Sequence, residues 1–96
     1  MYQRASQGGG SVSPTVTSKA LAVGGSVSFD APQNGVYWFE RTGTEYQNYA
    51  CGYFINGVHT NRVTRSPATV SVSGGRLTVG MGSGGQAGTV YLYTVN

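Results

Sequence analysis

The stretch FDAPQNGVYWF, which begins at Phe29 and ends at Phe39, decides the fold of this chain. Phe29 ends one predicted strand and faces a core, and Pro32 starts a turn at a position where a missing N–H does not weaken a sheet. Gly35 is expected to supply an unusual φ, which glycine adopts at low cost. Tyr37 and Phe39 share one face of the next strand because side chains alternate along a strand. The stretch therefore predicts a strand, a turn and a second strand.

Glycine-containing dipeptides divide the rest of the chain into short apolar runs, and such spacing is typical of short strands. The Asn56-Gly57 dipeptide favours a type I′ hairpin, which needs positive φ at both central residues. All three prolines fall at predicted strand starts or turns, where they are tolerated. The predicted strands lie near residues 15–23, 26–30, 35–41, 49–56, 58–64, 68–73, 76–81 and 89–95.

Most of these strands have one apolar face and one polar face. Leu77, Val79 and Met81, for example, alternate with Thr and Gly, as in a half-buried strand. The segments 36–39 and 90–93 differ because they are apolar or aromatic on both faces. Each of the two segments therefore has more apolar surface than one core can take.

The composition indicates a single all-β domain. The chain has 96 residues, of which 16 are Gly and only 9% are charged. Val, Thr and aromatic residues, which favour strands, greatly outnumber Leu, Glu and Lys. We expect a small antiparallel β-sandwich, jelly-roll-like and built of about eight short strands, over residues 12–96. We expect residues 1–11 to form a flexible glycine-rich arm.

The charged and sulfur-containing residues exclude several classes of protein. The net charge of +3 comes from cations spread along the chain, which predicts no nucleic-acid surface. Arg62 and Arg65, three positions apart, should lie on opposite faces unless a bulge intervenes. The single cysteine, Cys51, forbids an intrachain disulfide and indicates synthesis in a reducing compartment. The N-terminal stretch MYQRASQGGGSVS has no apolar h-region, so we expect no signal peptide and synthesis in the cytoplasm. No segment approaches about 18 apolar residues, so we expect no membrane insertion.

The chain offers few residues for catalysis. His59 is its single histidine, and the absence of any metal-ligand spacing predicts no metal and no cofactor. Cys51 and His59 could form a nucleophile pair, because the Asn56 hairpin makes their strands neighbours, and Glu40 and Glu45 could form a glycosidase pair. We favour a small buried cysteine and solvated loop acids instead. The sequence therefore predicts a protein that is not an enzyme.

The opening stretch also carries a resemblance. Its pattern Phe-x-x-Pro-x-x-Gly-x-Tyr-x-Phe resembles the signature strand-turn-strand of the C1q and tumour-necrosis-factor-like jelly rolls. The short strands, glycine-rich turns and the phrase INGV look like the fibre-tip and decoration domains of bacteriophages, and both groups are usually trimeric. The resemblance implies a homotrimeric virion component whose partners are other virion proteins or a cell-surface glycan or protein. The matching residues are Phe29, Pro32, Gly35, Tyr37 and Phe39.

Aromatic side chains are the remaining signal for binding. Aromatic side chains that cannot all face one core have three other uses. They can line a subunit interface, a platform for sugars or a surface on which bases stack. We weigh the interface first, because a small domain without a disulfide gains most from oligomerisation; the main alternative is a monomeric carbohydrate-binding module. The residues assigned to the core and the oligomer interface are Tyr37, Trp38, Phe39, Tyr91 and Tyr93. The residues expected to contact a ligand are Tyr46 and Tyr49, in a polar loop.

Overall fold

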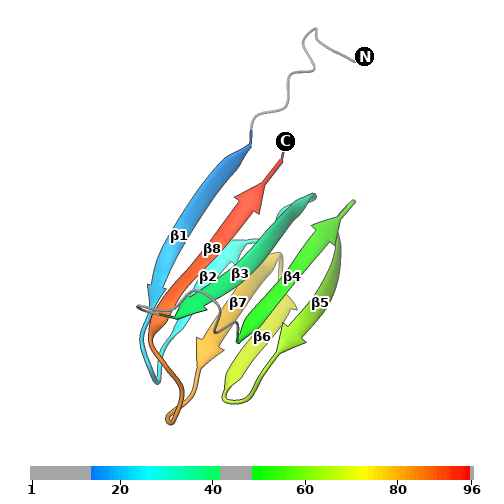
Figure 1. The fold of residues 1–96 in the computed structure, drawn as a ribbon. Coiled ribbons are helices and arrows are strands. Elements are labelled where there is room, and N and C mark those ends of the chain that lie inside the picture. The colour runs from blue at the N-terminus through cyan, green and yellow to red at the C-terminus, as the bar shows by residue number, and fades with distance from the viewer. Residues whose placement is uncertain (1–13, 42–48, 96) are drawn as a thin grey trace, which may run out of the picture.

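The structure is a computed structural model that describes residues 14–41 and 49–95. Within these residues the chain is all-β and forms two antiparallel sheets packed face to face (Figure 1), which confirms the predicted β-sandwich. The predicted arm at residues 1–11 lies outside the described residues. The strands are β1 (Thr15–Leu21), β2 (Ser26–Asp30), β3 (Gly35–Arg41), β4 (Ala50–Ile55), β5 (Val58–Thr64), β6 (Ala68–Ser73), β7 (Arg76–Met81) and β8 (Gly88–Thr94).

The two sheets differ in width. The larger sheet has the strand order β1-β8-β3-β4-β5, and the smaller sheet, behind it in Figure 1, has the order β2-β7-β6. The pairs β1–β8 and β2–β7 nest as in a jelly roll, while β3, β4 and β5 follow one another as a meander. Because three strands face five, the edges of the larger sheet have less cover than its centre. Six of the seven residues of the edge strand β1 are accordingly exposed.

Alternation of side chains assigns an inner and an outer side to each sheet. In β3, Tyr37 and Phe39 are buried between the sheets, whereas Val36 is exposed and Trp38 half-buried on the outer side. In β8, Val90 and Leu92 point inward, and the two tyrosines of the strand point outward. The strands predicted to be apolar on both faces therefore place one apolar set in the core and one on the surface.

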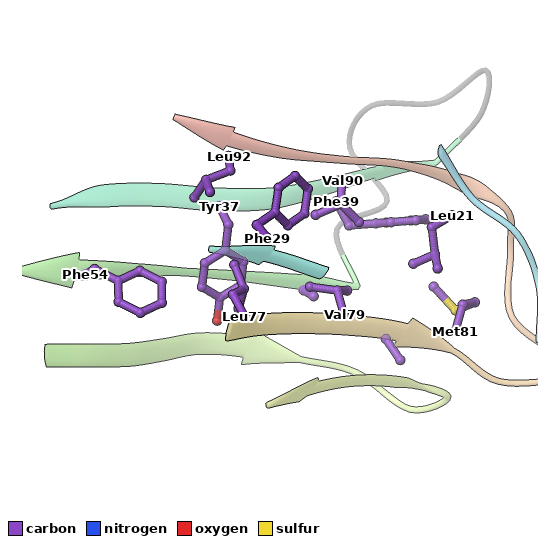
Figure 2. Close-up of a cluster of buried hydrophobic side chains, with 12 residues drawn as sticks. Leu21, Phe29, Tyr37, Phe39, Phe54, Leu77, Val79, Met81, Val90 and Leu92 are labelled. Carbon is purple, nitrogen blue, oxygen red and sulfur yellow. The ribbon is translucent and has the colours of Figure 1, made fainter. Parts of the chain in front are cut away.

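The core lies between the two sheets (Figure 2) and consists of aromatic and branched aliphatic side chains. Tyr37 and Val90 from the larger sheet, and Leu77 and Val79 from the smaller one, have no exposed surface. Phe54 lies toward one end of the cluster (Figure 2), and the centroid of its ring is 6.2 Å from that of Tyr37. The buried set is Leu21, Phe29, Tyr37, Phe39, Ala50, Phe54, Ala68, Leu77, Val79, Met81, Val90 and Leu92.

The turns confirm one prediction about glycine and correct another. Asn56 has φ 51° and Gly57 has φ 80°, as the predicted type I′ hairpin requires. Gly35, in contrast, does not have a positive φ. A Cβ at Gly35 would lie 2.5 Å from the carbonyl oxygen of Tyr93. Glycine is needed there because β3 and β8 approach closely, and the predicted unusual φ is wrong.

The first and last strands run side by side at one edge of the larger sheet. Thr15 at the start of β1 pairs with Thr94 at the end of β8. The two strands therefore begin and end at the same end of the sandwich (Figure 1).

Candidate functional site

The outer side of the five-stranded sheet carries a continuous apolar surface, which we call the aromatic face. Its side chains come from all five strands, and the pairing register makes them neighbours. At the outward positions of β1, β8, β3 and β4, Glu40 carries the one charge, and on β5 the exposed Arg62 stands beside Val63. The aromatic face consists of Val16, Val36, Trp38, Tyr53, Ile55, Val58, Val63, Tyr91 and Tyr93.

Register places Trp38 near the middle of this face. It lies opposite Tyr91 on one side and Cys51 on the other. The rings of Trp38 and Tyr91 stack with centroids 5.2 Å apart and planes 14° apart. The indole Nε1 of Trp38 donates a hydrogen bond of 2.9 Å to Oε2 of Glu40. The indole is therefore fixed in direction, with its polar group satisfied at the edge of the face.

The aliphatic side chains of the aromatic face are open to solvent. Val16 is 56% exposed, Val36 45%, Ile55 58% and Val58 66%. Single exposed aliphatic residues are ordinary on protein surfaces, but a contiguous apolar patch marks an interaction site. The aromatic face is such a patch, because these four residues surround Tyr53 and Tyr93 on neighbouring strands.

The outer side of the three-stranded sheet has the opposite character, and we call it the hydroxyl face. At one end Arg76 forms an ion pair with Asp30. In the middle, the hydroxyl of Ser28 lies 2.8 Å from that of Thr78. The outward positions of the three strands contain Ser26, Ser28, Asp30, Thr69, Ser71, Ser73, Arg76, Thr78 and Gly80. None of these described positions holds Val, Ile, Leu, Met or an aromatic residue.

The structure corrects part of the predicted interface. Tyr37 and Phe39 have exposed fractions of 0% and 1%, so they fill the core and have no surface to offer a partner. Their assignment to the core is confirmed, and their assignment to an interface is wrong. Trp38, Tyr91 and Tyr93 lie half-buried on the aromatic face, and their role in an interface stays a prediction.

Of the two residues predicted to contact a ligand, the structure describes one. Tyr46 lies outside the described residues. Tyr49 is half-buried and packs against the core, with its ring edge-on to Phe39 at 5.6 Å and 80°. Tyr49 thus covers one margin of the core, and ligand contact by this residue stays a prediction.

A polar cluster that the sequence did not indicate lies under the inner side of β5. The buried hydroxyl of Tyr37 lies 2.8 Å from Nε2 of His59 and accepts a hydrogen bond of 3.1 Å from Nδ2 of Asn61. Because Asn61 donates to it, the hydroxyl is free to donate its own proton to the imidazole. Gly52 makes room for this arrangement, since a Cβ there would collide with the Tyr37 hydroxyl.

Burial sets the protonation of this cluster. Desolvation raises the pKa of Tyr37 above its usual value, and the hydrogen bond from Asn61 acts in the opposite direction. Desolvation also lowers the pKa of His59. Both groups are therefore held neutral at pH 7, which agrees with a hydroxyl that donates to an uncharged imidazole.

The register separates the proposed nucleophile pair. Cys51 is paired with Val63 and faces outward, whereas His59 is paired with Phe54 and faces the core side. Glu45, which was considered as a partner of Glu40 and disfavoured, lies outside the described residues. In residues 14–41 and 49–95, no three His, Cys, Asp or Glu side chains gather as metal ligands. The described part of the chain also has no helix that is long and apolar enough to cross a membrane.

A bulge interrupts β5 beside β4. Cys51 pairs with Val63 and Gly52 with Asn61, which leaves Arg62 as an extra residue in the strand. Arg62 and Arg65 were expected on opposite faces of the sheet unless a bulge intervened. The bulge is present, so regular alternation does not apply to this pair. Both side chains are exposed, and Arg65 follows the end of the strand.

Comparisons of the chain with protein-family models, with curated proteins and with solved structures found no match. The function of the protein is therefore inferred from the side chains that its surface presents.

Proposed function

We propose that this protein is a non-enzymatic structural and binding module that assembles into a homo-oligomer through its aromatic face. The observation that carries the proposal is the solvent-open apolar surface centred on Trp38 and Tyr91. Tyr and Trp are enriched at protein interfaces, and charged residues are depleted at interface centres. The aromatic face has both properties.

A second copy of the chain is the occupant that fits this surface best. Apolar and aromatic side chains pack against one another at the centre of subunit contacts, and the aromatic face offers such side chains on all five strands. The whole chain has 96 residues and one cysteine, so neither size nor a disulfide gives the domain a large reserve of stability. Burial of this face against another copy would supply stability that the isolated sandwich lacks.

We further propose that the oligomer is a trimer and that it belongs to a bacteriophage virion, as a fibre tip or decoration protein. The support is the resemblance of the stretch from Phe29 to Phe39, together with a small sandwich in which β1–β8 and β2–β7 nest. In this proposal residues 1–11 attach the module to the particle. The outer loops of the domain then contact another virion protein or a cell-surface ligand.

Light scattering coupled to size exclusion, at low and high protein concentration, tests the assembly. We expect a mass of three chains at high concentration. Cys51 supplies an independent readout because it lies next to Trp38 on the aromatic face. Its reaction rate with a thiol reagent should fall as the oligomer forms. A monomer at every concentration, with unchanged Cys51 reactivity, would contradict the proposal.

A monomeric carbohydrate-binding module is the second candidate, and the stacked Trp38–Tyr91 pair favours it. Solvent-facing aromatic rings on a rigid sheet can stack on sugar rings. Trp38 is the single tryptophan, so its fluorescence reports directly on this face. Quenching by a glycan in a monomeric sample would favour the second candidate over the first.

A further inference from the structure

The edge strands of the two sheets are protected to different degrees. An edge strand exposes unpaired backbone groups, and natural proteins blunt such edges with bulges and charged side chains. β5 has the bulge at Arg62, β1 contains Lys19, and the same lysine donates to the carbonyl oxygen of Ser28 at the edge of β2. β6 has no such protection, because its register with β7 is continuous and it contains no charged residue and no proline. β6 is therefore the open edge among the described strands.

The turn after β6 determines which backbone groups point to this edge. Both residues of the turn at 74–75 have positive φ, 59° and 74°, as in a two-residue hairpin closed by a hydrogen-bonded pair. That pair is Ser73 and Arg76. Bonded and non-bonded pairs alternate along an antiparallel ladder, so the N–H and C=O groups of Val70 and Val72 point away from β7. Neither valine takes part in the described backbone hydrogen bonds outside the sheets, which leaves these groups free for a further strand.

The inner surfaces on this side of the sandwich are also uncovered. The side chain of Val72 points toward the larger sheet, as does that of Leu77 opposite it, yet Val72 is 38% exposed. Asn61 points inward from β5, where it donates to the Tyr37 hydroxyl, and it is exposed as well. The smaller sheet thus lacks a strand beneath β5. One extended segment paired with β6 would fill this place and cover both side chains.

The shape of the sandwich favours a single peptide strand over a second copy of the chain. The larger sheet is two strands wider than the smaller one, and the exposed inward side of β5 shows that it reaches past β6. Two copies paired through β6 would bring their larger sheets into the same space. A lone extended segment brings no second layer. Its main-chain groups supply affinity and its alternate side chains supply specificity.

The charges beside this edge favour an acidic segment. Arg62 on β5 and Arg65 in the connection to β6 are both exposed. The N–H of Ala68 donates to the carbonyl oxygen of Arg65, which places this arginine at the start of the open edge. The sequence from residue 46 to residue 96 contains no Asp or Glu. A carboxylate at this end of β6 would therefore meet two cations and no acidic residue of β4 to β8.

We propose that β6 binds an extended acidic peptide segment of a partner protein as a fourth, antiparallel strand of the smaller sheet. The backbone of the segment pairs with Val70 and Val72, its inward side chains pack on Val72 beneath β5, and a carboxylate at its C-terminal end binds Arg65. The chain's own N-terminal segment is a poor occupant, because residues 1–11 contain Arg4 and no acidic residue. The proposal goes beyond assembly through the aromatic face, since it concerns the other sheet.

An NMR titration of the full ¹⁵N-labelled chain with the acetylated peptide Ser-Val-Thr-Val-Thr-Val-Glu-Glu tests the proposal. We expect a dissociation constant of about 0.1 to 1 mM, which should rise with added salt. The largest shifts should occur at the amides of Val70 and Val72, and the hydrogen exchange of these two amides should slow. No binding, or shifts confined to another edge strand, would overturn the proposal.

A matched pair of substitutions in β6 tests the orientation of the bound peptide. Val72→Lys places a charge beneath the docked strand and should weaken binding at least about tenfold. Ser71→Lys adds the same charge to the same strand on the hydroxyl face, and it should leave the affinity within about twofold. Arg65→Gln should weaken binding about threefold to tenfold, whereas Lys19→Gln, at the opposite side of the sandwich, should not. Equal effects within either pair would contradict the proposed site.

Modified peptides test the backbone pairing without altering the protein. N-methylation of the three valines removes the N–H groups that face β6 and should abolish binding. N-methylation of the serine and the two threonines, whose N–H groups face solvent, should keep the affinity within about threefold. Replacement of the two glutamates by glutamine should weaken binding about threefold to tenfold, and this loss should disappear in Arg65→Gln. Equal losses from the two methylation patterns, or equal binding of hexaglutamate, would refute strand addition.

The oligomeric mass separates this inference from the proposed function. Light scattering of the parent protein and of the Val72, Ser71 and Arg65 variants should give the same mass with and without peptide. Peptide binding by a protein that proves monomeric would uphold the site at β6 and refute the aromatic interface. A trimer that binds no peptide would do the reverse.

Discussion

The two outer faces of this sandwich are built on the same backbone geometry and carry opposite chemistry. The aromatic face places Trp38 and Tyr91 at the centre of five strands, whereas the hydroxyl face places Ser28 and Thr78 at the centre of three. Both faces have few charges, so charge does not distinguish them. The difference lies in apolar area, which is the term that drives association. One face is suited to contact with protein and the other to contact with water.

The largest expected effect comes from a matched pair of substitutions, one on each face. Tyr91→Asp removes the partner of Trp38 and puts a charge at the centre of the proposed interface. We expect the oligomer to dissociate, with a loss of at least about 2 kcal/mol per contact, or about 30-fold in the dissociation constant. Thr78→Asp, on the hydroxyl face, should leave the mass by light scattering unchanged. Equal behaviour of the two variants would remove the functional distinction between the faces.

A smaller effect is expected beneath the larger sheet. Tyr37→Phe removes the hydroxyl that binds His59 and Asn61, so both side chains lose this hydrogen bond. We expect the free energy of unfolding to fall by about 1–3 kcal/mol in denaturant titrations. Tyr53→Phe, on the aromatic face, is the matched control and should change it by less than about 0.5 kcal/mol. A neutral Tyr37→Phe variant would show that the polar cluster does not hold β5 in place.

The single histidine, His59, makes the free energy of unfolding depend on pH. Burial lowers the pKa of His59 in the folded protein, while the unfolded chain titrates near about 6.5. Above that value both states are neutral and the contribution of His59 to stability is fully present. As the pH falls, the unfolded state takes up its proton first, so stability is lost down to the lowered folded pKa. Thermal melts between pH 7.5 and 4.5 should show this loss, and His59→Gln should flatten it.

The smallest effect is expected on the hydroxyl face. Ser28→Ala deletes one member of the Ser28–Thr78 hydroxyl pair, both of whose groups can turn to solvent. We expect the free energy of unfolding to change by no more than about 0.5 kcal/mol, and the oligomeric mass to stay the same. A large loss of stability or a change of mass would show that this face has a partner of its own.

Much of the fold could be predicted because the turns are strongly marked. The predicted ranges for β2, β3, β5, β6 and β7 agree with the observed bounds, and the other three differ by one or two residues at their ends. Glycine pairs and Asn56-Gly57 act over two residues, so their signal is local and survives in the sequence. The division of the strands into two sheets is not local, because it depends on which apolar faces meet.

The surface could be predicted less well than the strands. The pattern showed that β3 and β8 are apolar on both faces, but alternation alone does not say which face is inside. Tyr37 and Phe39 were therefore assigned to an interface although they fill the core. The cluster of Tyr37, His59 and Asn61 was missed because residues 22 and 24 positions apart meet only through the register of three strands. The bulge at Arg62 likewise has no signature in the sequence.

The pairing of Thr15 with Thr94 gives any assembly built on the aromatic face a polarity. A rotation axis parallel to the strands would bring every chain end to one pole of the particle, and extensions there would act as a multivalent tether with an effective concentration of about millimolar. A two-fold axis that lies in the contact plane, perpendicular to the strands, would send the ends to opposite poles. The direction of the symmetry axis therefore decides whether the assembly anchors to one surface by avidity or crosslinks two.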